Sequence, residues 1–277
     1  MPARGRSTPM SYAEFAPNEA LAPYVAAYWR FRVAANAGQI LHNVPLTGGF
    51  LLSVALKDGF TILVGPRTSP LRFVVRSRDA FWGVHFWPGA GTALMRVGAA
   101  DLREKEVPAS DVCGAEWTAR LAASLRIARG DAQAIAALNA ALSDRLPALV
   151  LDDRVMAAVL RIVAAGGVES VSDVARSVDL SPRHLRRRFV AATGLSPKEL
   201  ALLQRVRASA VDAVTTAQVR WTSIAAKRGF ADQPHLVHDF RRLVGLTPAS
   251  FLHHARRILH GEIRTAGKRT IPPDRSR

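Results

Sequence analysis

The chain has 277 residues, of which 49% are apolar and 22% charged, and its formal net charge is +16. This length allows two domains that each have a core, and the composition is ordinary for a globular protein. A single cysteine excludes a disulfide framework and a cysteine-based zinc cluster, and no apolar run is long enough to cross a bilayer, so we expect a cytoplasmic protein without a membrane partner.

The positive charge is unevenly distributed. Residues 1–150 contain 16 Lys and Arg against 11 Asp and Glu, whereas residues 151–277 contain 22 against 11. An excess of this kind is typical of a surface that binds nucleic acid. A membrane-surface protein is the competing interpretation, but it needs a basic amphipathic helix with bulky apolar residues, and none stands out.

The N-terminal half is predicted to contain a β-domain. Residues 1–10 are small, basic and proline-containing, and they predict a disordered tail before a domain at 11–150. Asp58-Gly59 separates two apolar runs, which is a hairpin signal. Short runs of this kind predict a small antiparallel β-sandwich or barrel with flanking helices, and they are FLLSVAL, FTILVG, LRFVVRS and FWGVHFWPG.

Two amphipathic helices are predicted within residues 115–149, joined by a turn at residues 129–131. We interpret them either as a cover for the β-domain or as the interface of a homodimer. Their apolar stripes are Trp117, Leu121 and Leu125 in the first helix, and Ile135, Leu138, Leu142 and Leu146 in the second.

Residues 151–260 are predicted to be all-helical and contain one pattern twice, so the fold class of the whole chain is α+β. His184–Leu200 (HLRRRFVAATGLSPKEL) and His235–Phe251 (HLVHDFRRLVGLTPASF) match at a constant offset of 51 residues. A short amphipathic stretch precedes each copy, which gives the helix-turn-helix plan twice. A tandem pair of such units is typical of a protein that binds double-stranded DNA. The segment 261–277 is predicted to be a basic disordered tail.

The first unit concentrates basic residues near the start of its second helix. Ser181 is a suitable N-cap, and Leu185 and Phe189 form a stripe for burial. The N-terminal part of a recognition helix contacts base edges. Arg187 points most directly away from the stripe, whereas Arg188 lies toward its flank, near the DNA backbone or a structural partner. The predicted DNA-binding residues of this unit are Ser181, Arg183, His184, Arg186, Arg187 and Arg188.

The second unit is capped by Asp232 and has its stripe at Leu236 and Phe240. A helix of about 18 residues that begins at Pro197 joins the units, and its length of roughly 27 Å approaches one turn of duplex, about 34 Å. One chain could therefore read two successive major-groove segments. The predicted DNA-binding residues of this unit are Gln233, His235, Val237, His238, Arg241 and Arg242.

Residues 168–256 resemble the DNA-binding domain of the AraC/XylS family of bacterial transcription regulators. The motifs that carry the resemblance are Gly229-Phe230, His235-Leu236, Phe240-Arg241 and Gly245-Leu246-Thr247-Pro248. Two positions depart from the family pattern: Asp179 replaces a usual glycine, and His238 replaces a common arginine. An aspartate tolerates the left-handed backbone better than most residues.

The segment Gly83–Met95 resembles the N-terminal domain of a subgroup of the same family. The resemblance implies a sequence-specific activator or repressor of transcription, with RNA polymerase as a candidate partner. The N-terminal domain then either senses a small-molecule effector or dimerises.

No catalytic or metal-binding residues are predicted, and no cofactor. Motifs of nucleotide-binding loops, serine hydrolases and zinc proteases are absent from the sequence, so we expect no enzyme activity. A DNA-tethered enzyme, such as an alkyl-transfer protein, is the first alternative. That chemistry needs an activated cysteine, and Cys113 does not stand in the required Pro-Cys-x-x-Arg context. A non-specific architectural DNA binder is the second. The arginines placed toward the bases argue against it, because phosphate contacts alone do not require that placement.

Overall fold

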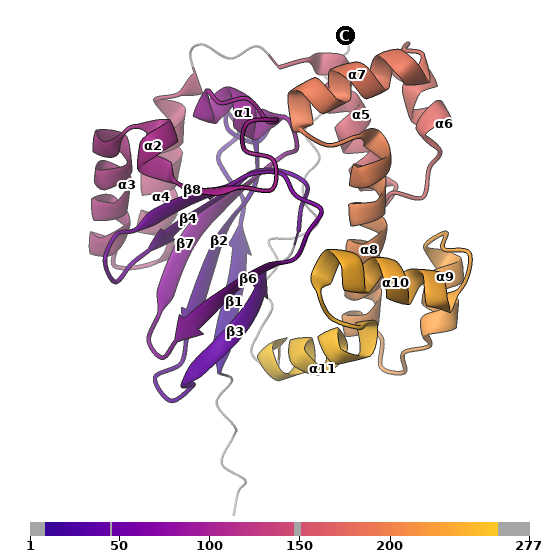
Figure 1. Cartoon of the computed structure of the whole chain (residues 1–277). Helices are drawn as coiled ribbons and strands as arrows, with labels where there is room; N and C mark the ends of the chain where they lie inside the picture. The colour runs from indigo at the N-terminus through magenta and orange to yellow at the C-terminus, as the bar shows by residue number, and fades with distance from the viewer. Residues whose placement is uncertain (1–8, 45, 147–150, 260–277) are drawn as a thin grey trace, which may run out of the picture.

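The computed structural model describes residues 9–44, 46–146 and 151–259, with side chains to residue 256. Its N-terminal half is antiparallel β-structure with flanking helices and its C-terminal half is helical (Figure 1), which confirms the α+β class. Most of the two predicted tails, residues 1–8 and 261–277, lies outside the described residues. Met10 was placed in the first tail, but it begins a strand, pairs with Val33 and is only 2% exposed, because its side chain packs into the β-domain core.

Two antiparallel sheets form the β-domain. The large sheet has the order β1-β2-β7-β4-β5-β8, and β3 pairs with β6 alone. The four predicted apolar runs are β4, β5, β6 and β7, and Asp58-Gly59 lies in the β4–β5 turn, as predicted. The strands are β1 (Met10–Phe15), β2 (Val25–Val33), β3 (Gln39–Val44), β4 (Leu51–Ala55), β5 (Thr61–Val64), β6 (Leu71–Arg76), β7 (Ala80–Phe86) and β8 (Glu106–Pro108).

The large sheet buries both of its faces. Successive residues of a strand point to opposite sides, so the neighbours Tyr28 and Trp29 of β2 enter different cores. Tyr28 faces the helices α2 (Ala109–Cys113), α3 (Ala115–Ile127) and α4 (Asp131–Ser143), which cover one side of the sheet (Figure 1). Trp29 packs between the large sheet and the β3–β6 pair. The apolar stripes of α3 and α4 are buried against the sheet, which supports their interpretation as a cover.

The C-terminal half has two cores that share one long helix, α8 (Pro197–Thr215). The first core lies among the start of α8 and the helices α5 (Asp153–Ala164), α6 (Val171–Arg176) and α7 (Pro182–Thr193). The second lies among the rest of α8 and the helices α9 (Trp221–Lys227), α10 (Gln233–Val244) and α11 (Pro248–Leu259). Figure 1 shows α8 running from one helix-turn-helix unit to the other.

The sequence repeat is also a structural repeat. Ser181 and Asp232 cap α7 and α10 through their side chains. Gly194 and Gly245 end the same helices with φ of 72° and 76°, in the left-handed region where a side chain is strained. The predicted offset of 51 residues therefore relates equivalent caps at both ends of the two helices.

Candidate nucleic-acid interface

Helix α7 presents a basic face that starts directly after its cap. The Ser181 hydroxyl accepts a hydrogen bond from the His184 backbone N–H at 3.3 Å, and Pro182 is the first helical residue. Leu185 and Phe189 are fully buried, which fixes the rotation of the helix. The predicted residues that this rotation leaves exposed are Arg183, His184, Arg186 and Arg187.

Arg188 does not share that face. Its Nε lies 2.7 Å from Asp152 Oδ2, and its terminal nitrogen lies 2.8 Å from Asp152 Oδ1. The same carboxylate caps α5 by accepting a hydrogen bond from the Val155 N–H at 3.2 Å. Of the two roles considered for Arg188, the structure shows the contact with a structural partner, and a contact with the DNA backbone stays a prediction.

Helix α10 repeats the arrangement with fewer cations. Asp232 Oδ1 accepts a hydrogen bond from the His235 backbone N–H at 2.7 Å, while Leu236 and Phe240 are fully buried. His238, Arg241 and Arg242 are exposed, whereas Gln233 and Val237 are partly buried. A shallow hollow on this helix is lined by Pro234, Val237, His238, Arg241 and Arg242.

The Asp239 carboxylate contacts His235 and Arg242, two of the predicted DNA-binding residues. Asp239 itself was not predicted from the sequence. His235 Nε2 lies 3.1 Å from Asp239 Oδ2, and the Ala231 N–H donates to His235 Nδ1 at 3.4 Å. Arg242 lies 3.3 Å from the other carboxylate oxygen. The spacings i, i+4 and i, i+3 on one helix could have revealed this cluster. The imidazole of His235 is fixed by these contacts, so Val237, His238 and Arg241 are the better candidates for base contacts.

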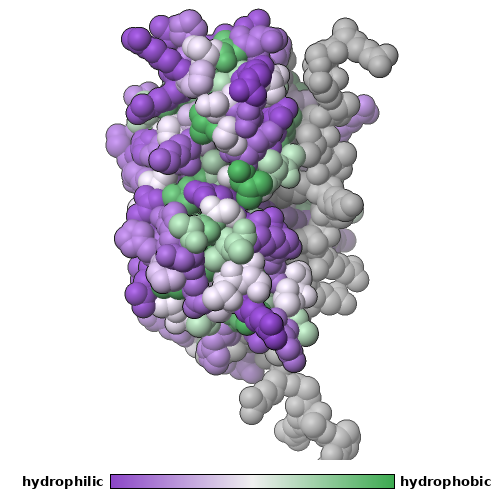
Figure 2. All heavy atoms as spheres, turned by 90° about the vertical axis from the view of Figure 1, so that its right-hand side faces the viewer, coloured by the Kyte–Doolittle hydropathy of each residue, from purple (hydrophilic) through white to green (hydrophobic). Residues whose placement is uncertain are grey.

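The surface over the helix-turn-helix units is mostly hydrophilic, with small scattered apolar areas (Figure 2).

The turn that leads into α7 contains Asp179 with φ of 53°. This residue adopts the left-handed backbone expected for the position, so its departure from the family pattern does not disturb the turn.

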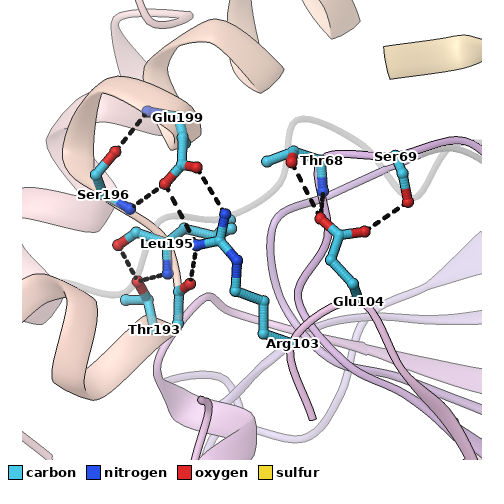
Figure 3. Close-up of polar contacts among 9 residues, drawn as sticks. Thr68, Ser69, Arg103, Glu104, Thr193, Leu195, Ser196 and Glu199 are labelled. Carbon is cyan, nitrogen blue, oxygen red and sulfur yellow. Dashed lines mark hydrogen bonds and ion pairs between the residues drawn. The ribbon is translucent and has the colours of Figure 1, made fainter. Parts of the chain in front are cut away.

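A side chain from the N-terminal half enters the turn between α7 and α8 (Figure 3). Arg103 donates to the Gly194 carbonyl oxygen at 2.6 Å and to Glu199 Oε1 at 2.7 Å. The other oxygen of Glu199 accepts from the Ser196 N–H at 2.7 Å, which completes the capping box of α8. The first recognition helix therefore ends on a contact with the β-domain.

The neighbour of Arg103 faces the opposite way. Glu104 accepts hydrogen bonds from the Thr68 backbone at 2.6 Å and from the Ser69 hydroxyl at 2.5 Å (Figure 3).

Burial alone raises the pKa of Glu199, but the hydrogen bonds from Arg103 and Ser196 outweigh it and hold that pKa below its usual range. Glu199 is therefore ionised and paired at neutral pH.

A second candidate site is an apolar cavity between the two sheets. Trp29 Nε1 and His42 Nδ1 are buried at its wall without a hydrogen-bond partner among the described residues. Burial, and secondly the charge of His254, lower the pKa of His42 to about 4, so its ring is neutral at pH 7. Phe60 and Val74 line the cavity and are 54% and 47% exposed, which places its mouth at these residues.

The described residues give little support for a reactive cysteine, a metal site or a membrane span. Cys113 is buried, and burial raises the pKa of its thiol. Within the described parts of the chain, no three His, Cys, Asp or Glu side chains gather as a metal site requires. The described helices are also too short or too polar to cross a membrane.

The helix-turn-helix geometry agrees with comparison to known families. Residues 174–254 match the model of a helix-turn-helix domain family, and residues 13–108 match a domain of unknown function (DUF6597). The protein is thus a DNA-binding transcription regulator. The match over residues 174–254 confirms the AraC-type helix-turn-helix domain that the sequence motifs predicted. No curated relative matches the chain.

Several solved structures are similar to the chain. An AraC-type transcriptional regulator from Chromobacterium violaceum is 26% identical over 39% of this chain and 95% of its own, with a TM-score of 0.35. The DNA-binding domain of AdpA, in complex with a target DNA, is 25% identical over 40% of this chain and all of its own, with a TM-score of 0.36. ToxT from Vibrio cholerae is 12% identical over 92% of this chain and all of its own, with a TM-score of 0.45.

Proposed function

We propose that this regulator reads two successive major-groove segments of one DNA duplex, with α7 in the first and α10 in the second. The observation that carries the proposal is the repeated, capped helix whose buried stripe turns polar and basic residues outward. Helix α8 has 19 residues and is therefore about 28 Å long, which is close to one turn of duplex. We also infer a cytoplasmic location, which the DNA-binding domain supports.

The two helices are unequal readers. Arg183, Arg186 and Arg187 are exposed on α7, and arginine can bridge guanine O6 and N7 with two hydrogen bonds. Helix α10 offers His238 and Arg241 in the corresponding region. We therefore assign most of the base discrimination to α7.

Footprinting after selection from random duplexes tests this proposal. We expect two protected segments about one helical turn apart on one face of the DNA. With about six phosphate contacts, log K should fall against log salt with a slope of roughly −5. A slope near zero on the selected duplex, or protection without sequence preference, would refute specific reading and favour a different mode of binding.

The alternative of a DNA-tethered enzyme has less support. Its chemistry needs a reactive thiolate, whereas Cys113 is buried and its pKa is raised. We propose that the N-terminal half has no catalytic role.

The cavity supports a second role for the N-terminal half, the binding of a small-molecule effector. No cationic or anionic group among the described residues lines it, apart from histidines, and His42 is neutral. A charged ligand would lose its hydration without gaining a partner, which is costly. We infer an uncharged, mostly apolar ligand that has a hydrogen-bond acceptor for Trp29 Nε1.

The β3–β6 pair gives this cavity a route to the second helix-turn-helix unit. His42 on β3 lines the cavity and lies within electrostatic reach of His254 on α11. The backbone at Gly245, where α10 ends, lies against Pro70 and Arg72, at the start of β6. A displacement of the β3–β6 pair by a ligand would therefore act on the second unit through α10 and α11.

Thermal unfolding with acetophenone and benzoate tests the ligand class. The two molecules have similar size and both accept hydrogen bonds, but only benzoate is charged. We expect acetophenone to raise the Tm of the wild type, benzoate to leave it unchanged, and Trp29→Phe to reduce the acetophenone effect. Stabilisation by benzoate alone would exclude the uncharged class.

A further inference from the structure

Four cations surround a hollow between the two reading helices, which we call the inter-head hollow. Arg186 comes from α7, Lys198 from the first turn of α8 and Arg242 from α10, while Arg103 enters from the N-terminal half. Glu199 is the only carboxylate in the lining among the described residues. The hollow therefore gathers positive charge from both helix-turn-helix units and from the helix that joins them.

These cations differ in how far they are already neutralised. Arg103 is paired with Glu199 at 2.7 Å, and Arg242 contacts Asp239 at 3.3 Å. Arg186 and Lys198 are exposed and have no ion pair among the described residues. The hollow thus keeps an unbalanced positive charge that the protein does not satisfy internally.

We propose that the inter-head hollow holds a phosphate of the DNA backbone, at the point where the duplex passes from the first reading helix to the second. This inference rests on the proposed reading of two major-groove segments. Between two such segments on one face, a duplex turns its backbone and minor groove toward the protein. Lysine and arginine side chains bind backbone phosphate and fix the register of a protein on DNA without reading sequence.

Lys198 is the residue that this inference adds to the DNA interface. It follows Pro197 at the start of α8, and the hollow that it lines also takes one arginine from each recognition helix. A phosphate in the hollow would contact both units at once. Its binding would therefore fix the position of one reading helix against the other on the duplex.

An acidic segment of a partner protein is a different occupant for the same charges. The DNA backbone is favoured because Arg186 and Arg242 belong to the helices that the proposed function places on DNA. The hollow also adjoins the second reading surface, since Arg242 lines both.

A methylphosphonate scan of the selected duplex tests the proposal with the full-length protein. Replacing one phosphate between the two segments with a neutral methylphosphonate should weaken binding by the wild type. The same replacement should have no further effect on Lys198→Ala. This variant should also weaken binding equally for all sequences and reduce the magnitude of the salt slope by about 1.

Lys57→Ala is the matched control, because Lys57 is an exposed lysine in the β4–β5 turn, which lies beside α3. It should leave both the slope and the methylphosphonate profile unchanged. Lys198→Gln should reproduce Lys198→Ala. Inorganic phosphate alone, at fixed ionic strength, should give no Lys198-dependent rise in Tm.

Three results would overturn the proposal. The first is an unchanged slope and methylphosphonate profile in Lys198→Ala. The second is a loss of transcriptional activity in this variant with intact DNA binding, which would point to a protein partner. The third is Lys198-dependent stabilisation by inorganic phosphate, which would indicate a site for a free anion. A failure to protect two segments would instead defeat the proposed function itself.

Discussion

Arg188 and Asp152 form a two-point ion pair that joins the first recognition helix to the cap of α5, with distances of 2.7 and 2.8 Å. Asp152 thereby serves two helices, since it also accepts the Val155 N–H. The pair fixes how α7 is seated on its own unit, so a basic residue of the predicted recognition helix contributes to the fold.

Arg188→Ala should lower the free energy of unfolding by about 1 kcal/mol or less, because both side chains are partly exposed and solvent screens the pair. Asp152→Asn should have a similar effect, since asparagine keeps the cap but loses the charge. Urea denaturation measures both. Both variants should keep the base preference of the wild type. A loss of base preference with unchanged stability would show that Arg188 contacts the bases.

Arg187→Ala should weaken binding to the selected duplex and relax base preference at one or two positions, with a loss of discrimination of about 1–3 kcal/mol. His238→Ala should change specificity less, because a histidine ring edge offers a single hydrogen bond to a base, whereas arginine offers two. Binding to the duplex and to its single-base variants measures both effects. If His238→Ala erased the preference and Arg187→Ala left it intact, α10 would be the main reader.

Gly194→Ala should destabilise the protein more than Gly229→Ala. Both glycines have left-handed φ, 72° and 69°, so each substitution carries backbone strain of roughly 1–2 kcal/mol. At Gly194 the new Cβ would also lie 3.0 Å from the Ala99 carbonyl oxygen, whereas at Gly229 the nearest atom is 3.9 Å away. Urea denaturation should show a clear difference between the variants. Equal losses in the free energy of unfolding would mean that the Ala99 backbone moves away from the new Cβ at little cost.

Acid should destabilise the β-domain through His42. Burial lowers its pKa in the folded state to about 4 from the ordinary 6.5, so the unfolded chain takes up the proton first as the pH falls. The stability from neutral His42 is full above about pH 6.5 and is lost progressively down to about pH 4, by about 3 kcal/mol at most. His42→Phe keeps the stacking on Phe31 and should flatten the curve in this window. An unchanged pH dependence would contradict the assignment.

A fragment of residues 151–259 should fold and bind DNA without the β-domain. The buried members of its two cores all come from within this range, and Leu46 is a partly buried addition from outside. Circular dichroism should show a helical, cooperatively unfolding fragment, with a lower Tm because the Arg103 contacts are lost. An unfolded fragment would show that the division near residue 150 is wrong.

The sequence predicts the helical units well because their determinants are local. Ser181 and Asp232 act on backbone groups three residues away, and the buried stripes recur every three or four residues. The determinants of strands β4 to β7 are also local, since each strand is an apolar run that ends at turn residues.

Contacts between distant segments had no comparable signal. Arg188 meets Asp152 across 36 residues, and Arg103 meets Gly194 across 91. Strand β3 was missed because it lies in a two-stranded sheet, where half-exposed residues show only weak alternation. The cavity depends on how the two sheets pack, so its wall residues could not be grouped from their order in the chain.

The 51-residue repeat has a consequence for the symmetry of the DNA target. Two-fold dimers bind palindromic sites because their symmetry is mirrored in the sequence they read. Here both reading helices belong to one chain, and they present unlike side chains, with exposed arginines on α7 and with His238 and Arg241 on α10, so the two half-sites cannot be equivalent. A single molecule would therefore require an oriented, non-palindromic target with two unlike half-sites in fixed order. Inverting one half-site would present its bases backwards to the helix that reads them.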